Sequence, residues 1–179
     1  DAPNPLAKEC GIIFIGSPDT QLVPFQHEDF EVTAVEGNIF AIKLKDKPYP
    51  VRIIATPFAN EMRLKTYLGA EDRDEALNEL LKSRWQYYAE KYCDSEGVNL
   101  LTSHLYMLKK GGEILEESEG EKPLKVGNAE VIYTDCIPSQ IQYTALGHLH
   151  SYNNIGEKQN PVVYSSSPLA YSFSEVGKE

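Results

Sequence analysis

The sequence is poor in cysteine and has no long hydrophobic run. Its three cysteines, Cys10, Cys93 and Cys136, are widely spaced and form no CxxC pair. An odd and sparse set argues against a disulfide framework and is typical of a reducing compartment such as the cytoplasm. We therefore expect all three to be free and buried as small apolar side chains. The longest apolar runs, such as residues 11–15, are far shorter than the ~20 residues that a membrane-spanning helix needs.

Basic residues are also scarce. The chain has 17 Lys and Arg against 27 Asp and Glu, which gives a formal net charge of −10. This balance disfavours tight, nonspecific binding of nucleic acid by the chain alone. It does not exclude chemistry on nucleic acid, because bound divalent metal ions would add local positive charge. With 179 residues, of which 41% are hydrophobic, the chain is long enough for one domain with a sizeable core.

Several catalytic signatures are missing from the chain. It contains no P-loop, no GxGxxG turn and no GxSxG nucleophile elbow. The serine run Ser165–Ser167 has no nearby base in the sequence, so we interpret it as a turn rather than as a nucleophile.

The apolar pattern predicts short strands around one long helix. Asn4 and Pro5 open a short helix that ends near Cys10. A short, fully buried strand is expected at Ile12–Ile15 and a second short helix from residue 60 to 69. The other expected strands lie at 30–35, 39–44, 51–55, 97–106, 125–133, 141–146, 162–164 and 171–173. This order predicts an α/β fold in which ligands gather outside the carboxyl ends of strands.

The strongest helix signal covers residues 71–93. Apolar residues recur there at spacings of three and four, as an amphipathic helix requires. They are Leu77, Leu81, Trp85, Tyr88 and Tyr92. We interpret the aromatic members as a core stripe rather than as a platform on which bases stack.

Two polar features are predicted to be ordinary surface. His27 lies between polar and acidic neighbours and is expected to be a solvated loop residue rather than a metal ligand. Lys43, Lys45 and Lys47 could form a phosphate-binding comb, but lysines at this spacing more often mark the wet face or edge of a strand.

The other three histidines, His104, His148 and His150, all follow apolar strand segments. In an extended segment alternate residues point the same way, so His148 and His150 can converge on one metal ion or on two adjacent ions. Three imidazoles suit zinc, manganese, iron or nickel equally well on ligand type. The alternative is one surface histidine and one hydrogen-bonded core residue. Asn99 and Asp135 are further polar candidates, and nothing in the sequence brings them to the histidines.

Three ordered segments carry a specific resemblance. They are Leu100-Leu101-Thr102-Ser103-His104-Leu105, then Ala145-Leu146-Gly147-His148-Leu149-His150, then Tyr164-Ser165-Ser166-Ser167-Pro168-Leu169 with Ser172-Phe173-Ser174-Glu175. In this order and spacing they resemble SbcD, the nuclease subunit family of bacterial SbcCD complexes, within the calcineurin-like metallophosphoesterases. The opening 1–16 also resembles the segment that follows the Gly-Asn-His-Asp motif of that family. The resemblance covers essentially the whole chain and is clearest over 97–175.

The resemblance implies a fold and a metal site. The fold would be part of a metallophosphoesterase β-sandwich flanked by helices, with four α/β/β/α layers in the intact domain. In that family two divalent ions, usually Mn²⁺, are held by seven side chains at strand ends. By motif, His104 and His148 would ligate one ion and His150 the other. The remaining ligands and the catalytic histidine of the family would lie upstream of Asp1, so we expect no catalytic residue within this chain.

We therefore expect residues 1–179 to be the C-terminal portion of a single nuclease domain, with a capping domain downstream. The absence of an initial methionine agrees with a piece of a longer protein. On its own the chain is expected to have little or no nuclease activity and weak or partial metal occupancy.

The resemblance also implies partners and an activity. The intact protein would be a DNA exonuclease and endonuclease that processes double-strand breaks or hairpins with an SMC-like ATPase of the SbcC type. It would be a cytoplasmic homodimer that does not bind membranes. Two alternatives are another calcineurin-like phosphoesterase, acting on nucleotides or phosphoproteins, and a non-catalytic interaction module that uses the helix at 5–10.

This sequence departs from the family pattern in two places. Ser151-Tyr152-Asn153 stand where the family usually has a basic residue, proline and glutamine, and Ser166 stands where glycine is common. These departures bear on local DNA contacts and on the geometry of the final turn.

Overall fold

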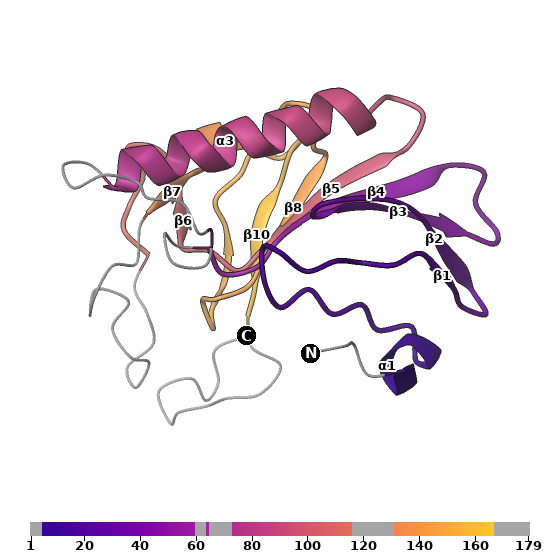
Figure 1. Cartoon of the computed structure of the whole chain (residues 1–179). Helices are drawn as coiled ribbons and strands as arrows, with labels where there is room; N and C mark the ends of the chain where they lie inside the picture. Colours follow the sequence, from indigo (N-terminus) through magenta and orange to yellow (C-terminus); the bar gives the residue numbers. More distant parts are fainter. Residues whose placement is uncertain (1–4, 60–63, 65–72, 116–130, 167–179) are drawn as a thin grey trace.

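The computed structural model describes residues 5–59, 64, 73–115 and 131–166 (Figure 1). Its centre is an eight-stranded mixed sheet in the order β1-β2-β3-β4-β5-β8-β10-β9, with helix α3 along one face. The elements are α1 Pro5–Glu9, β1 Phe25–Gln26, β2 Phe30–Glu36, β3 Ile39–Leu44, β4 Pro50–Thr56, α3 Arg73–Tyr92, β5 Val98–Ser103, β6 Met107–Leu108, β7 Ile132–Tyr133, the 3₁₀ turn η1 Thr134–Cys136, β8 Tyr143–Leu146, β9 Tyr152–Asn154 and β10 Val162–Ser165. A small second sheet pairs β6 with β7.

The first half of the large sheet is an antiparallel meander from β1 to β4. The tight turn between β2 and β3 contains Gly37 at φ 54, a backbone conformation that glycine adopts without strain. Lys43 in β3 and Lys45 and Lys47 beyond it are exposed, which agrees with the predicted wet face of a strand, since β3 lies inside the sheet. The strands predicted at 30–35, 39–44 and 51–55 are confirmed.

The second half of the sheet is parallel and determines where the site lies. Strands β4, β5, β8 and β10 run parallel to one another, and β9 is antiparallel to β10. Because parallel strands end at the same edge of a sheet, the residues that follow Ser103, Leu146 and Ser165 meet along one edge. This edge carries the predicted histidines.

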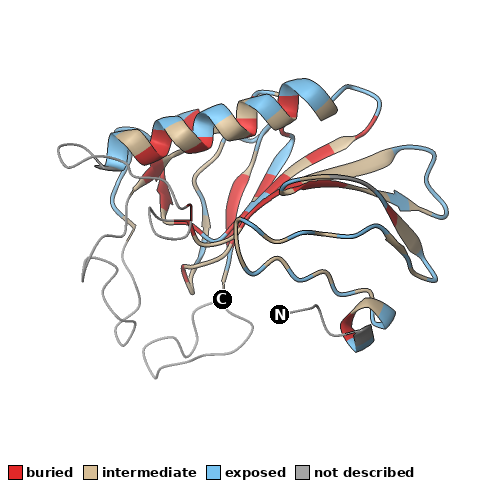
Figure 2. Ribbon diagram, viewed as in Figure 1, coloured by how far each residue is buried: buried red, intermediate tan, exposed pale blue. Residues whose placement is uncertain are grey.

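The main core lies between α3 and the sheet. The apolar stripe of α3 buries Leu77, Leu81, Trp85 and Ala89 against strands β3, β4, β5, β8 and β10 (Figure 2). The indole Nε1 of Trp85 donates a hydrogen bond of 2.8 Å to Oγ1 of Thr56, which satisfies the one polar atom of that ring. The predicted core stripe is confirmed, and the acidic first turn of α3 agrees with the favourable sign of the helix dipole.

The opposite face of the sheet carries a smaller cluster and a segment that differs from the prediction. Figure 1 shows the chain after α1 running along this face. Ile13 and Ile15 pack on the cluster, whereas Ile12 and Phe14 are 49% and 56% exposed. The predicted buried strand at Ile12–Ile15 is therefore wrong: its apolar side chains alternate as in a strand, but among the described residues no neighbouring strand pairs with it.

His27 also differs from the prediction of a solvated residue. Its ring stacks on Phe30 with centroids 4.8 Å apart, and only 18% of its side chain is exposed. Nε2 lies 3.2 Å from the carbonyl oxygen of Glu9, and Nδ1 accepts a hydrogen bond from the backbone N–H of Asp29. His27 thus fastens the end of α1 to the hairpin of β1 and β2, which local sequence could not show.

The remaining predictions on the fold have mixed outcomes. Cys136 is buried, but Cys10 is exposed, so the expectation of three buried thiols is wrong; Cys10 follows the exposed end of a short helix. The second short helix, apart from residue 64, and the strand at 171–173 lie outside the described residues, as does most of the strand at 125–133. Among the described helices, none is both long and apolar enough to cross a membrane. The predicted α/β class is confirmed, and the mixed sheet with few helices is consistent with a metallophosphoesterase-like sandwich.

Candidate metal centre

The ends of β5 and β8 bring two of the predicted histidines together. His104 directly follows β5, and its backbone N–H donates to the carbonyl of Thr56 at the end of β4. Gly147 directly follows β8 and donates its N–H to the carbonyl of Ser103. These bonds continue the ladder of three parallel strands by one residue, so the positions of His104 and His148 are tied to the sheet.

The two imidazoles face each other across the strand ends. Nε2 of His104 lies 3.3 Å from Nδ1 of His148, and the ring centroids are 5.0 Å apart at an interplanar angle of 83°. Two imidazole nitrogens bound to one ion at about 2.0–2.1 Å, with an angle between the octahedral 90° and the tetrahedral value, would be roughly 2.8–3.4 Å apart. The observed separation therefore fits two ligands of a single metal ion.

His148 reaches this position through an uncommon backbone conformation. Its φ is 97, a value that non-glycine residues seldom adopt. The next residue, Leu149, is buried in the main core and anchors the loop. The predicted convergence of His148 and His150 stays a prediction; burial alternates along 148–150, with Leu149 buried between two less buried histidines, although His148 has a positive φ. Strained residues of this kind cluster at functional sites.

Gly147 lies close to the ring of His104 and leaves room for it. A Cβ built on Gly147 would lie 3.0 Å from Nδ1 of His104, tighter than nearly all real contacts. A side chain here would push the imidazole out of line with His148. The glycine of the Gly-His-Leu-His motif thus makes room for a ring from the neighbouring strand, a role that the sequence alone did not indicate.

Partial removal from water, together with neighbouring imidazoles, favours the neutral form of both facing histidines, although part of His104 stays in contact with solvent. The pKa of His148 is lowered to about 4, first by burial and then by the neighbouring imidazoles of His104 and His150. The pKa of His104 is also lowered, by burial and then by His150. A metal ion binds the neutral form of imidazole. Each of the two rings can therefore give an electron pair to a metal ion at pH 7. His150 is close enough to lower the pKa of both rings.

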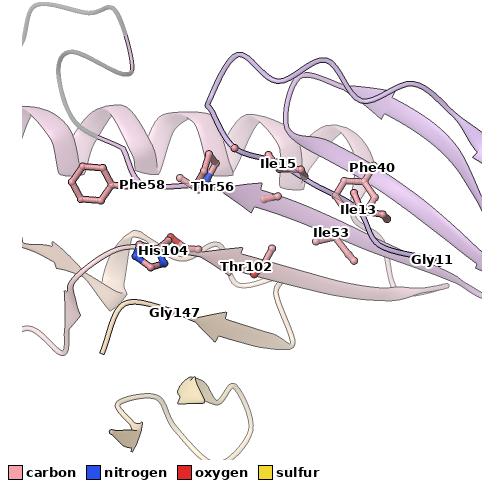
Figure 3. A pocket seen from close by; sticks show the side chains of 14 residues that line it. Gly11, Ile13, Ile15, Phe40, Ile53, Thr56, Phe58, Thr102, His104 and Gly147 are labelled. Atoms are coloured by element: carbon pink, nitrogen blue, oxygen red, sulfur yellow. The ribbon is translucent and has the colours of Figure 1, made fainter. Parts of the chain in front are cut away.

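An open cleft runs from His104 along the sheet face opposite α3. Its volume is about 610 Å³, and Figure 3 shows His104, Gly147 and Thr102 at one end and Ile13 and Phe40 toward the other. The wall beside the histidine is mixed, with Phe58 at the same end, and it is apolar farther along the sheet.

The described residues supply imidazoles but no carboxylate at this edge. They contain no group of three or more His, Cys, Asp or Glu side chains placed to hold a metal ion. Asn99 lies at the start of β5, where it accepts a hydrogen bond from Arg52. Asp135 pairs with Lys110 at 3.6 Å. Neither polar candidate from the sequence joins the histidines in the part of the chain that the structure describes.

The structure is a mixed sheet with two imidazoles beyond the carboxyl ends of its parallel strands. This arrangement is consistent with a metallophosphoesterase-like fold. The chain is 30% identical over 176 residues, or 98% of its length, to SbcD, the D component of the nuclease SbcCD, of Bacillus subtilis (strain 168). It is 32% identical over 131 residues, or 72% of its length, to the SbcD of Staphylococcus epidermidis (strain ATCC 12228 / FDA PCI 1200). A scan against models of protein families finds no match.

The chain is thus SbcD-like along nearly its whole length. It covers 40% of the Bacillus subtilis relative and 32% of the Staphylococcus epidermidis relative. The similarity therefore concerns less than half of either related protein.

Proposed function

We propose that this chain is part of a metal-dependent nuclease subunit that hydrolyses phosphodiester bonds in DNA. The observation that carries the proposal is the pair of neutral imidazoles, His104 and His148, 3.3 Å apart at the carboxyl edge of an SbcD-like sheet. Divalent ions, Mn²⁺ by expectation, would supply Lewis-acid stabilisation of the phosphate charge and would lower the pKa of water.

Each histidine has a defined part in this proposal. His104 and His148 would share one ion, because their nitrogens have the separation that common ligation requires. His150 would serve a second, adjacent ion from the same loop. The rigid ends of β5 and β8 hold the first two donors, so little rearrangement is needed when the ion binds.

The chain's negative charge supports a role for the metal. At a net charge of −10, it has little general attraction for a polyanion, and the positive charge needed to hold a phosphate would come from bound ions. Imidazoles without a carboxylate would hold Mn²⁺ weakly, because this ion prefers oxygen ligands. We accordingly expect the 179-residue chain alone to show weak or partial metal occupancy and little or no nuclease activity.

The partners are proposed from the names of the relatives. Both are named as the SbcD component of the nuclease SbcCD, so we infer that the protein containing this chain assembles with an SbcC-type ATPase in the cytoplasm. Processing of double-strand breaks or hairpins, and homodimer formation, belong to the same proposal. Both relatives carry the nuclease name, and no observation favours the alternatives of a nucleotide phosphoesterase or a non-catalytic module.

A nuclease assay on the full-length protein tests this function. Alanine at His104, His148 and His150 together should abolish Mn²⁺-dependent degradation of DNA. His27→Asn is the matched control, because it removes the fourth histidine, which joins α1 to the first hairpin and lies away from the carboxyl edge of the parallel strands. Unchanged activity in the triple variant would refute the proposal.

A further inference from the structure

Ser166, the first residue after β10, combines an uncommon backbone conformation with a directed hydrogen bond. Its φ is 71, and its Oγ donates to the backbone carbonyl of His150 over 2.8 Å. Among the described residues, the non-glycine residues with positive φ are Ser166 and His148. Both lie at the carboxyl edge of the sheet, where the loop 147–151 passes over the end of β10.

The sheet order explains why this bond spans the loop that carries the histidines. Strand β10 lies between β8 and β9, and it pairs Tyr164 with Leu146 on one side and Ser165 with Tyr152 on the other. The loop 147–151 must therefore pass over the end of β10 as it goes from one flank to the other. Ser166 lies beneath that crossing and bonds to its fourth residue, His150.

Serine at this position has a strained backbone, whereas glycine would not. A positive φ places the Cβ of an L-residue against its own backbone, and glycine adopts the same conformation freely. Glycine, however, has no hydroxyl with which to bond to His150. The strained serine therefore supplies a contact that an unstrained glycine cannot make.

We propose that Ser166 is a positioning residue for the metal centre. Its hydroxyl fixes the carbonyl of His150, and this bond, together with buried Leu149, sets the orientation of the loop from His148 to His150. The inference rests on the proposed metal site and adds to it a residue that does not touch the metal. Groups that orient metal ligands in this way typically change metal affinity by about 10–100-fold when they are removed.

Two substitutions in the full-length protein separate the hydroxyl from the backbone. Ser166→Gly removes the hydroxyl and the strain together, whereas Ser166→Ala removes the hydroxyl and keeps the strain. Ser165→Ala is the matched control, because Ser165 is an exposed neighbouring serine in the last position of β10. The measurements are Mn²⁺ affinity by titration, the thermal midpoint of the metal-free protein, and the carbonyl ¹³C chemical shift of His150.

We expect both Ser166 variants to bind Mn²⁺ at least about tenfold more weakly and to shift the His150 carbonyl resonance. Ser166→Gly should keep or raise the thermal midpoint, Ser166→Ala should lower it, and Ser165→Ala should match the wild type throughout. A wild-type protein that binds Mn²⁺, with affinity unchanged within about twofold in both Ser166 variants, overturns the positioning role alone. A wild-type protein that binds no Mn²⁺ overturns the proposed metal site and this role with it.

Discussion

His148→Asn tests two properties of the site in one variant. The dependence of stability on pH reports the neutral histidine, and the stability at pH 7 reports the strained backbone. The pKa of His148 is about 4 in the folded protein against 6.5 ordinarily, chiefly because the ring is buried. As pH falls from 6.5 toward 4, the unfolded chain therefore takes up a proton that the folded protein does not. The free energy of unfolding consequently decreases through this window and levels off below it.

The size of this effect follows from the same pKa. A fall from 6.5 to about 4 corresponds to about 3 kcal/mol for a group fully shielded from solvent. The ring is only partly buried, so we expect about 1–2 kcal/mol after allowing for solvent screening. Asparagine does not titrate, and it tolerates positive φ better than histidine does. His148→Asn should therefore be as stable as the wild type or up to ~1 kcal/mol more stable at pH 7, and less sensitive to acid.

Urea unfolding in the presence of a chelator measures both expectations. Trp85, the one tryptophan of the sequence, is 1% exposed and reports loss of the core by its fluorescence. Between pH 7 and pH 4.5 the wild type should lose about 1–2 kcal/mol more than the variant. An equal loss in the two proteins, or a His148 ring that titrates near 6.5 by NMR in the folded protein, would refute the reasoning.

Two further substitutions test the supports of the site. Tyr164→Phe removes the hydroxyl to which the buried N–H of Met107 donates at 2.6 Å, so unfolding by urea should show a loss of about 1–3 kcal/mol, and a loss below ~0.5 kcal/mol would contradict the assigned bond. Gly147→Ala places a methyl group against the ring of His104, so Mn²⁺ affinity should fall about tenfold or more with a smaller change in the thermal midpoint. Unchanged affinity in that variant would show that the ring tolerates displacement.

The sequence predicts the regular elements of this fold well where one face is buried. The stripe from Leu77 to Trp85 has a helical period because one side of α3 packs on the sheet, and that period is visible in the chain. Ile12–Ile15 has an equally clear apolar pattern but forms no strand. Strand formation depends on a hydrogen-bonding neighbour, which no local pattern contains.

The sequence identifies the residues of the candidate site but does not predict how they are arranged in space. Motif and resemblance select His104, His148 and His150, and the parallel pairing of β5 with β8 explains why the first two meet. The positive φ of His148 could not be predicted, since propensity gives no sign that a histidine adopts it here. The contribution of Ser166 escapes sequence reasoning for the same cause, because the serine run resembles an ordinary polar turn.

We propose above that imidazole nitrogens of this chain bind the divalent metal of a nuclease. Pulsed electron paramagnetic resonance on the full-length protein with Mn²⁺ tests this claim most directly, because ¹⁴N hyperfine coupling reports nitrogen bound to the ion. We predict ¹⁴N coupling in the wild type, its reduction in His148→Asn, and its retention in His27→Asn. Mn²⁺ bound to an active protein without ¹⁴N coupling, or with coupling that survives alanine at His104, His148 and His150, would contradict the account.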